Sequence, residues 1–291
     1  MTTPASLIRE TANPNLGVGG HAELCCELAR DYENKGEYEQ AREVLSTLWP
    51  CIDQHPRVDG LEPAIAAEVL MRAGVLTGWS GAQIPDAQEK AKDLISKSLA
   101  IFESQKYQEK IAEAQTELAL CYMRAGEYSN ASDFLKLALA QLPAHSELAA
   151  KAVLRSGIVK RHASDLNEAL AFLAENEALF QKIDNQMLKG CYHQTLGDVL
   201  KDLWELKRPG DYLDRAFIEY AAASFHLEQA GHRRYLANVE NNLGFLYLKI
   251  NYCNEAHEHL NRARRNFNLL KDAIALAQVD ETRARSRSPW I

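Results

Sequence analysis

The chain has 291 residues, of which 46% are hydrophobic and 25% charged, and its formal net charge is −7 at pH 7. This composition is typical of a folded, soluble protein and excludes disorder over most of the length. The acidic balance argues against nucleic acid as the main ligand, and no apolar run reaches the roughly 18 residues of a membrane span. No basic-then-apolar leader opens the sequence, so we expect a cytoplasmic protein.

Residues 1–20 are rich in Pro and Gly and are expected to form a flexible leader. After them, one stretch of sequence occurs twice with identical internal spacing. Residues 28–32 lead to Gly-Glu-Tyr at 36–38 and to Ala41, and residues 118–122 lead to Gly-Glu-Tyr at 126–128 and to Ala131. This pattern resembles the tetratricopeptide repeat family, in which each repeat is a pair of antiparallel helices.

With the phase set by these two copies, small residues recur in six helix pairs. In the first helix they are Ala29, Gly74, Ala119, Gly157, Gly197 and Gly244. In the second helix they are Ala41, Ala91, Ala131, Ala169, Ala216 and Ala256. Small residues let the two helices of a pair cross closely, and a bulky residue four positions after each alanine is expected to fill the space between pairs.

The predicted pairs lie near residues 22–55, 64–105, 112–143, 147–182, 187–230 and 235–270. A partial seventh pair follows at 273–285, and residues 286–291 form a tail. No single pair can bury its apolar face alone, so the pairs must stack. We therefore predict an all-α, right-handed superhelical array of six helix pairs plus a terminal helix over residues 21–285, about thirteen helices in total.

Residues that bear on chemistry favour a non-enzymatic protein without a cofactor or metal. His257 and His259 are two residues apart and lie on different sides of a helix, so they cannot share a metal and are expected to be surface residues. Cys25 and Cys26 are expected to be idle thiols, Cys26 facing the inner groove, and the six cysteines are interpreted as reduced core residues. No phosphate-binding glycine loop or nucleophile elbow occurs.

The resemblance implies that the first helices line a concave groove that binds a protein or peptide. The positions that the family uses there correspond to these candidate partner-binding residues: Thr116, Leu120, Met123, Arg124, Leu154, Arg161, Gln194, Asp198, Lys201, Asn238, Asn241, Phe245 and Lys249. Amide side chains can bond an extended peptide backbone, and the apolar ones could seat side chains. The Lys and Asn clamp by which chaperone-binding members of the family hold a C-terminal carboxylate is absent.

The run from Val239 to Tyr247 and the residues that follow resemble bacterial regulators with many such repeats. This resemblance implies the sensing or scaffolding part of a bacterial regulator, with no direct binding of nucleic acid by this chain. Three alternatives stay open: a small-peptide receptor that changes curvature, a non-catalytic subunit of an enzyme complex, and docking outside the groove. The last would use the convex side or the basic end near Arg262, Arg264 and Arg265.

Overall fold

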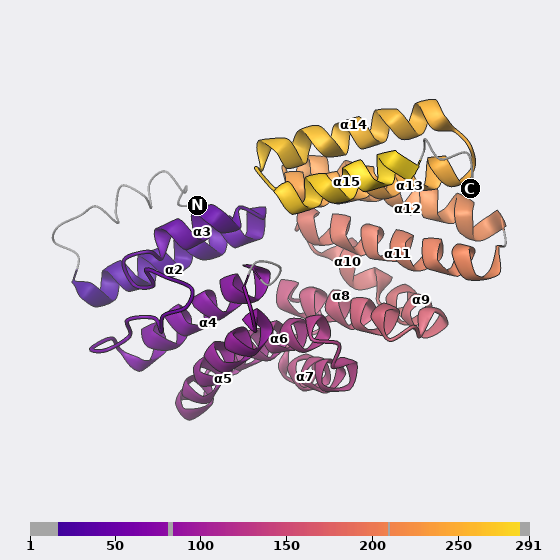
Figure 1. The fold of residues 1–291 in the computed structure, drawn as a ribbon. Coiled ribbons are helices and arrows are strands. Elements are labelled where there is room, and N and C mark those ends of the chain that lie inside the picture. Colours follow the sequence, from indigo (N-terminus) through magenta and orange to yellow (C-terminus); the bar gives the residue numbers. More distant parts are fainter. Residues whose placement is uncertain (1–16, 81–83, 209, 286–291) are drawn as a thin grey trace. The chain divides into compact units, whose positions relative to one another are not determined.

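The computed structural model describes residues 17–80, 84–208 and 210–285, and these residues form helices and connecting turns without a strand (Figure 1). Contacts within the chain group it into two compact units, residues 1–162 and 163–291, called here the N-terminal unit and the C-terminal unit. The described residues hold fourteen helices. The predicted all-α array of helix pairs is confirmed.

The N-terminal unit contains α2 (Val18–Lys35), α3 (Tyr38–Val44), α4 (Pro63–Trp79), α5 (Ala87–Gln105), α6 (Gln108–Arg124), α7 (Tyr128–Gln141) and α8 (Glu147–His162). The C-terminal unit contains α9 (Leu166–Glu175), α10 (Glu177–Lys182), α11 (Gln186–Lys207), α12 (Gly210–Gln229), α13 (Arg233–Lys249), α14 (Cys253–Leu269) and α15 (Ala273–Arg285). The first helices of the predicted pairs are α2, α4, α6, α8, α11 and α13, with α15 the terminal helix. The division between the units falls inside the predicted fourth pair, between α8 and α9.

The repeated Gly-Glu-Tyr sequence forms the turn between the two helices of a pair. Gly36 and Gly126 have φ angles of 73° and 81°, in the left-handed region that glycine adopts without strain. The N–H of Gly36 bonds to the carbonyl of Glu33 and closes the end of α2. A glycine at this position therefore ends the first helix and lets the chain reverse within three residues.

Close helix crossings explain the small residues of the repeat. A Cβ atom on Gly74 would lie 2.6 Å from Ile95 of α5, and one on Gly244 would lie 2.6 Å from Leu260 of α14. On Gly197 it would lie 2.8 Å from the ring of Tyr220 on α12. Real Cβ atoms do not approach this closely, so the backbones meet at the positions that the repeat phase predicts.

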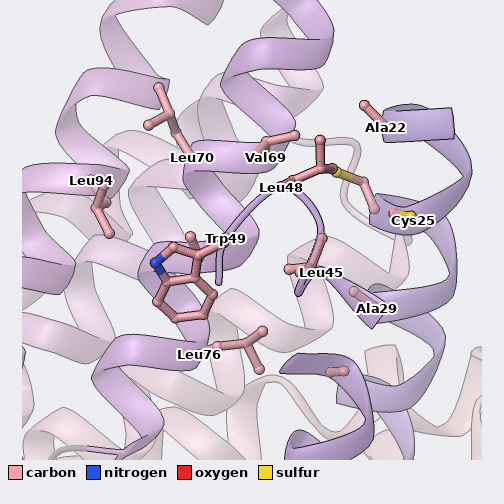
Figure 2. Close-up of a cluster of buried hydrophobic side chains, with 13 residues drawn as sticks. Ala22, Cys25, Ala29, Leu45, Leu48, Trp49, Val69, Leu70, Leu76 and Leu94 are labelled. Atoms are coloured by element: carbon pink, nitrogen blue, oxygen red, sulfur yellow. The ribbon is translucent and has the colours of Figure 1, made fainter. Parts of the chain in front are cut away.

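Core packing follows the same phase. The six second-helix alanines are fully buried, and the six bulky residues that follow them, Leu45, Ile95, Leu135, Leu173, Tyr220 and Leu260, are at most 1% exposed. Figure 2 shows the cluster in which Leu45, Trp49 and Leu76 meet between α2 and α4. Each cluster draws side chains from successive helices, as stacked repeats require.

Three details differ from the sequence-based expectation. Helix α2 begins at Val18, inside the expected leader, whose residues 1–16 lie outside the described part. Helix α3 ends at Val44 rather than near residue 55, and the buried Trp49 then holds the irregular segment by donating Nε1–H to the carbonyl of Gln54 at 3.1 Å. The second helix of the fourth pair breaks at Asn176 into α9 and α10, which raises the helix count from thirteen to fourteen.

Two of the cysteines also differ from the interpretation as core thiols. Cys51 and Cys253 are exposed, because one lies in the irregular segment after α3 and the other is the first residue of α14. The other four are buried, and all six are free. Among the described residues, no helix combines the length and the apolar character needed to cross a membrane.

Candidate functional site

The first helices of the N-terminal unit carry a row of nine charged side chains on one connected face. This charged row consists of Arg30, Glu33, Glu68, Arg72, Lys110, Glu113, Glu117, Lys151 and Arg155. The residues come from α2, α4, α6 and α8, and every ion pair but two links one helix to another. The side of α2, α4, α6 and α8 that carries the charged row is called here the first-helix face of this unit.

Arg72 of α4 lies at the centre of the charged row and is 2% exposed. Its guanidinium donates to Glu33 of α2 at 2.5 Å and to Glu113 of α6 at 2.7 Å. The carboxylate of Glu68, one turn earlier on α4, lies 3.7 Å from Nε. One buried cation therefore contacts acids from three successive first helices. Because desolvation offsets much of the attraction in such pairs, the arrangement fixes the helices in place more than it adds stability.

The row continues toward α8 through Glu117, whose side chain is 3% exposed. Its carboxylate accepts hydrogen bonds from Lys151 at 2.6 Å and from Arg155 at 2.8 Å. A second N–H of Arg155 donates to the backbone carbonyl of Thr116 at 2.6 Å. Charge-assisted hydrogen bonds therefore join α6 to α8 on this face.

Burial and neighbouring cations shift the acids in opposite directions. Burial raises the pKa of Glu33, since desolvation of its carboxylate outweighs the attraction of Arg72. Burial acts on Glu113 in the same sense, but Arg72, Arg30 and Lys110 outweigh it and lower the pKa of Glu113 to about 2. The pKa of Glu117 is likewise lowered against its burial, by Arg155 and Lys151. Glu113 and Glu117 are therefore ionised at neutral pH.

A pocket of about 330 Å³ opens on the same face, among α2, α4, the end of α5 and the start of α6. Its apolar lining comes from Cys26, Ala64, Ile65 and Phe102. Its charged lining comes from Arg30, Glu68 and Lys110 of the charged row, and from Glu23 and Glu27 of α2, which are exposed. The exposed Tyr107 completes it. Five of its ten lining residues are charged, so the pocket offers a ligand both apolar contact and ionic partners.

Neither the charged row nor the pocket was predicted from the sequence. A signal was present, because the residue two positions before the small residue of the first helix is Arg72, Glu117 and Arg155 in three successive copies. Charges of alternating sign at one repeat position indicate pairing between stacked helices. We instead expected ligand-facing residues at positions taken from the family pattern.

Among the predicted partner-binding residues of the N-terminal unit, two are corrected by the structure. Thr116 is fully buried, donates its hydroxyl to the carbonyl of Ala112 and is covered by Arg155 of α8. Leu154 is 6% exposed and belongs to the core. Neither offers a surface to a ligand.

The other four keep some exposed surface. Arg124 is exposed and its guanidinium lies 5.4 Å from the ring centre of Trp79, a cation–π distance. Leu120, Met123 and Arg161 are half-buried. Met123 packs against a core cluster that includes Ala131 and Leu135.

In the C-terminal unit, the predicted residues of α11 and α13 come together. The ring centre of Phe245 lies 5.7 Å from the ammonium nitrogen of Lys201 and 5.1 Å from that of Lys249. Lys201 also pairs with Asp202 at 2.6 Å. These two cations around a half-buried ring form the most distinctive feature of this first-helix face.

The polar residues predicted on α11 and α13 differ in how far contacts within the fold occupy their hydrogen-bonding groups. Asp198 accepts hydrogen bonds from Tyr220 at 2.6 Å and from Asn242 at 2.8 Å, so it holds α11 against α12 and α13. Asn241 is half-buried, and in the described part of the chain its Oδ1 accepts no hydrogen bond. Gln194 and Asn238 are also half-buried.

Cys26, His257 and His259, which the sequence singled out for their chemistry, are engaged within the fold. Burial raises the pKa of Cys26 to about 12, so its thiol stays protonated at neutral pH. His259 contacts Glu240 at 2.8 Å and also bonds to Arg262, which corrects the expectation of a surface histidine; His257 bonds to the carbonyl of Cys253. Across the described ranges, no group of three or more His, Cys, Asp and Glu residues could hold a metal ion.

Comparison with known proteins gives likenesses in structure alone. No family model and no curated protein matches the sequence. The structure of a Rap protein complexed with competence and sporulation factor is similar with a TM-score of 0.64 at 14% identity, covering 95% of this chain and 79% of that one. NprR in complex with its cognate peptide NprX gives 0.63 at 14% identity, with 97% and 82% covered.

A third similar structure is aspartyl phosphate phosphatase F from Bacillus subtilis, with a TM-score of 0.62 at 13% identity, covering 98% of this chain and 78% of that one. Identities this low establish the fold. The chain therefore has the tetratricopeptide-type fold that its repeat pattern predicts.

Proposed function

We propose that this chain is a non-enzymatic binding module that holds a peptide, or a peptide-like segment of a protein, on the faces of its first helices. Two observations carry the proposal: in the N-terminal unit the first helices bear the charged row and a pocket of about 330 Å³, and in the C-terminal unit they bear amide side chains and the ring of Phe245 between two lysines. Extended surfaces of this kind are what stacked helical repeats use for recognition.

The similar structures support this proposal. Two of them are described as complexes with a peptide or with a competence and sporulation factor. By analogy of fold, we propose that this chain forms the sensing or scaffolding part of a cytoplasmic bacterial regulator. The protonated thiol of Cys26 and the mutually compensated charges of the row support binding over catalysis.

The test uses variants of the C-terminal unit. The purified chain is immobilised, bacterial lysate is passed over it, and bound proteins and peptides are identified by mass spectrometry. The double substitution N241A/F245A removes one amide and the ring between the two lysines, and we expect it to weaken partner binding by about 1 kcal/mol or more for each true hot spot. Circular dichroism checks that the wild-type chain and N241A/F245A have the same melting temperature.

A matched control removes two side chains from a second helix. Ile218 and Phe225 are 66% and 59% exposed on α12, so I218A/F225A deletes a similar apolar surface from a different face. We expect this control to bind partners normally. Loss of binding in the control together with normal binding of N241A/F245A would move the site off the first helices. The charge reversals R264E and R265E test the basic end in the same assay.

A further inference from the structure

The pocket of the N-terminal unit has a lining that selects for a particular kind of side chain. Cys26 and Phe102 are 3% and 1% exposed and form its buried part. Ile65 packs against the core cluster of α2 and α4, and its Cδ1 atom lies 3.6 Å from the place of a Cβ on Gly19. The pocket has room for one or two side chains, since its volume of about 330 Å³ lies at the lower end of the roughly 300–1,000 Å³ of small-ligand sites.

The cations inside the pocket are already compensated. Arg30 donates two hydrogen bonds to Glu68, at 2.7 and 2.9 Å, and Lys110 bonds to both Glu68 and Glu113. An acidic ligand would have to displace these carboxylates and would lose their charge-assisted bonds. The interior therefore does not select for an anion.

The uncompensated charges of the pocket lining belong to exposed side chains. Glu23 and Glu27 are exposed, line the pocket and are four residues apart on α2, so both carboxylates lie on one side of the helix. Two like charges at this spacing on a helix repel each other and destabilise it. Across the described ranges, no basic side chain pairs with either residue. A cation brought by a ligand would relieve this repulsion.

We propose that this pocket binds a peptide segment in which a bulky apolar residue is followed by Lys or Arg. The apolar side chain fills the space against Ile65 and Phe102, and the basic side chain extends to Glu23 and Glu27. Its apolar stem passes the ring of Tyr107, in the way that long basic side chains cover apolar surface. This inference rests on the proposed function and names the class of peptide that the N-terminal unit selects.

The experiment measures binding of three small probes to the full chain by methyl NMR. The probes are N-acetyl-Leu-Arg-amide, N-acetyl-Leu-Glu-amide and N-acetyl-Ala-Arg-amide, and the reporter is the δ1 methyl of Ile65, assigned through I65V. We expect a saturable shift with the Leu-Arg probe, and at least about tenfold weaker binding of each of the other two. Raising the salt concentration should weaken the Leu-Arg probe.

Variants separate the two parts of the recognition. E23Q/E27Q keeps the shape and should weaken the Leu-Arg probe about tenfold, since it removes both charges that attract the basic side chain. A64F fills the pocket and should abolish binding of every probe. The matched control E255Q/E258Q removes two exposed glutamates from α14 and should leave binding unchanged.

Three outcomes would overturn this inference: no saturable shift at Ile65, equal binding of the Leu-Arg and Leu-Glu probes, or normal binding by E23Q/E27Q. The proposed function is tested independently of the pocket. If the probes fail at the pocket while N241A/F245A still releases captured partners, the chain binds peptides elsewhere on its first helices. If the probes bind as expected and N241A/F245A captures partners normally, the pocket is the site and the face around Phe245 is not.

Discussion

Removing the buried cation of the charged row tests whether the row is an interdependent unit. In R72M the carboxylate of Glu33, 8% exposed, loses the cation that holds it at 2.5 Å, whereas Glu68 and Glu113 keep Arg30 and Lys110. At pH 8, above the raised pKa of Glu33 of about 7, a buried charge is left without its partner, and breaking a buried pair from one side in this way costs about 3–5 kcal/mol. At about 2–4 °C per kcal/mol for a unit of this size, the melting temperature should fall by roughly 6–20 °C.

A double-mutant cycle then isolates the interaction. E33Q alone should cost little, because burial already disfavours the charge on Glu33 and Arg72 keeps two other acids. R72M/E33Q should be more stable than the sum of the single effects predicts, by about 1–3 kcal/mol. Chemical denaturation followed by circular dichroism gives each free energy of unfolding. Additive costs within about 0.5 kcal/mol would refute the reasoning.

The pH dependence of the R72M defect is a second readout. A carboxyl whose pKa is raised in the folded state carries no penalty below its unfolded pKa, near 4.5, and a growing one as the pH rises. Loss of Arg72 raises the pKa of Glu33 further. The stability difference between wild type and R72M should therefore be small at pH 5 and large at pH 8. A difference that is constant over this range would exclude Glu33 as its source.

Other predictions address packing, acid stability and thiol reactivity. Ala131→Leu should cost about 1–3 kcal/mol in thermal melts because Ala131 is fully buried at a helix crossing, whereas the same change at exposed Ser129 should cost little, and equal costs would disprove the repeat phase. The pKa of Glu113 is lowered to about 2, so it contributes stability above pH 4.5 that is lost as the pH falls; E113Q should flatten the acid limb of the stability curve. A thiol reagent should modify exposed Cys51 and Cys253 quickly and the buried thiols only on unfolding, and fast labelling of a third thiol would contradict the burial.

The repeat phase was predictable because it depends on local geometry. Gly74, Gly197 and Gly244 are needed wherever two backbones approach, and a spacing of small residues records that approach directly in the sequence. The end of α3 at Val44 could not be predicted in this way. The segment that follows is held by a hydrogen bond from the indole of the buried Trp49 to the carbonyl of Gln54, and such a bond leaves no periodic pattern in the sequence.

Candidate site residues were harder to predict because exposure depends on the neighbouring helix. Thr116 occupies a position that faces the groove in the family pattern, but Arg155 from α8, 39 residues later, covers it. Partners so far apart in sequence are joined only when both helices have their final rotation. The contacts of Phe245 with Lys201 and Lys249 have the same origin, since α11 supplies one cation and α13 the other.

The charged row also limits how this repeat array can evolve. Arrays of near-identical repeats lengthen or shorten by duplication and deletion, because each unit fits any neighbour. Here the second pair supplies Arg72, to which Glu33 of the first pair and Glu113 of the third are bonded. If the third pair followed the first directly, the position of Arg72 would be held by Glu117, so Glu33 would face an acid in place of its cation. The second pair therefore cannot be removed without placing like charges together, although it follows the same repeat pattern as its neighbours.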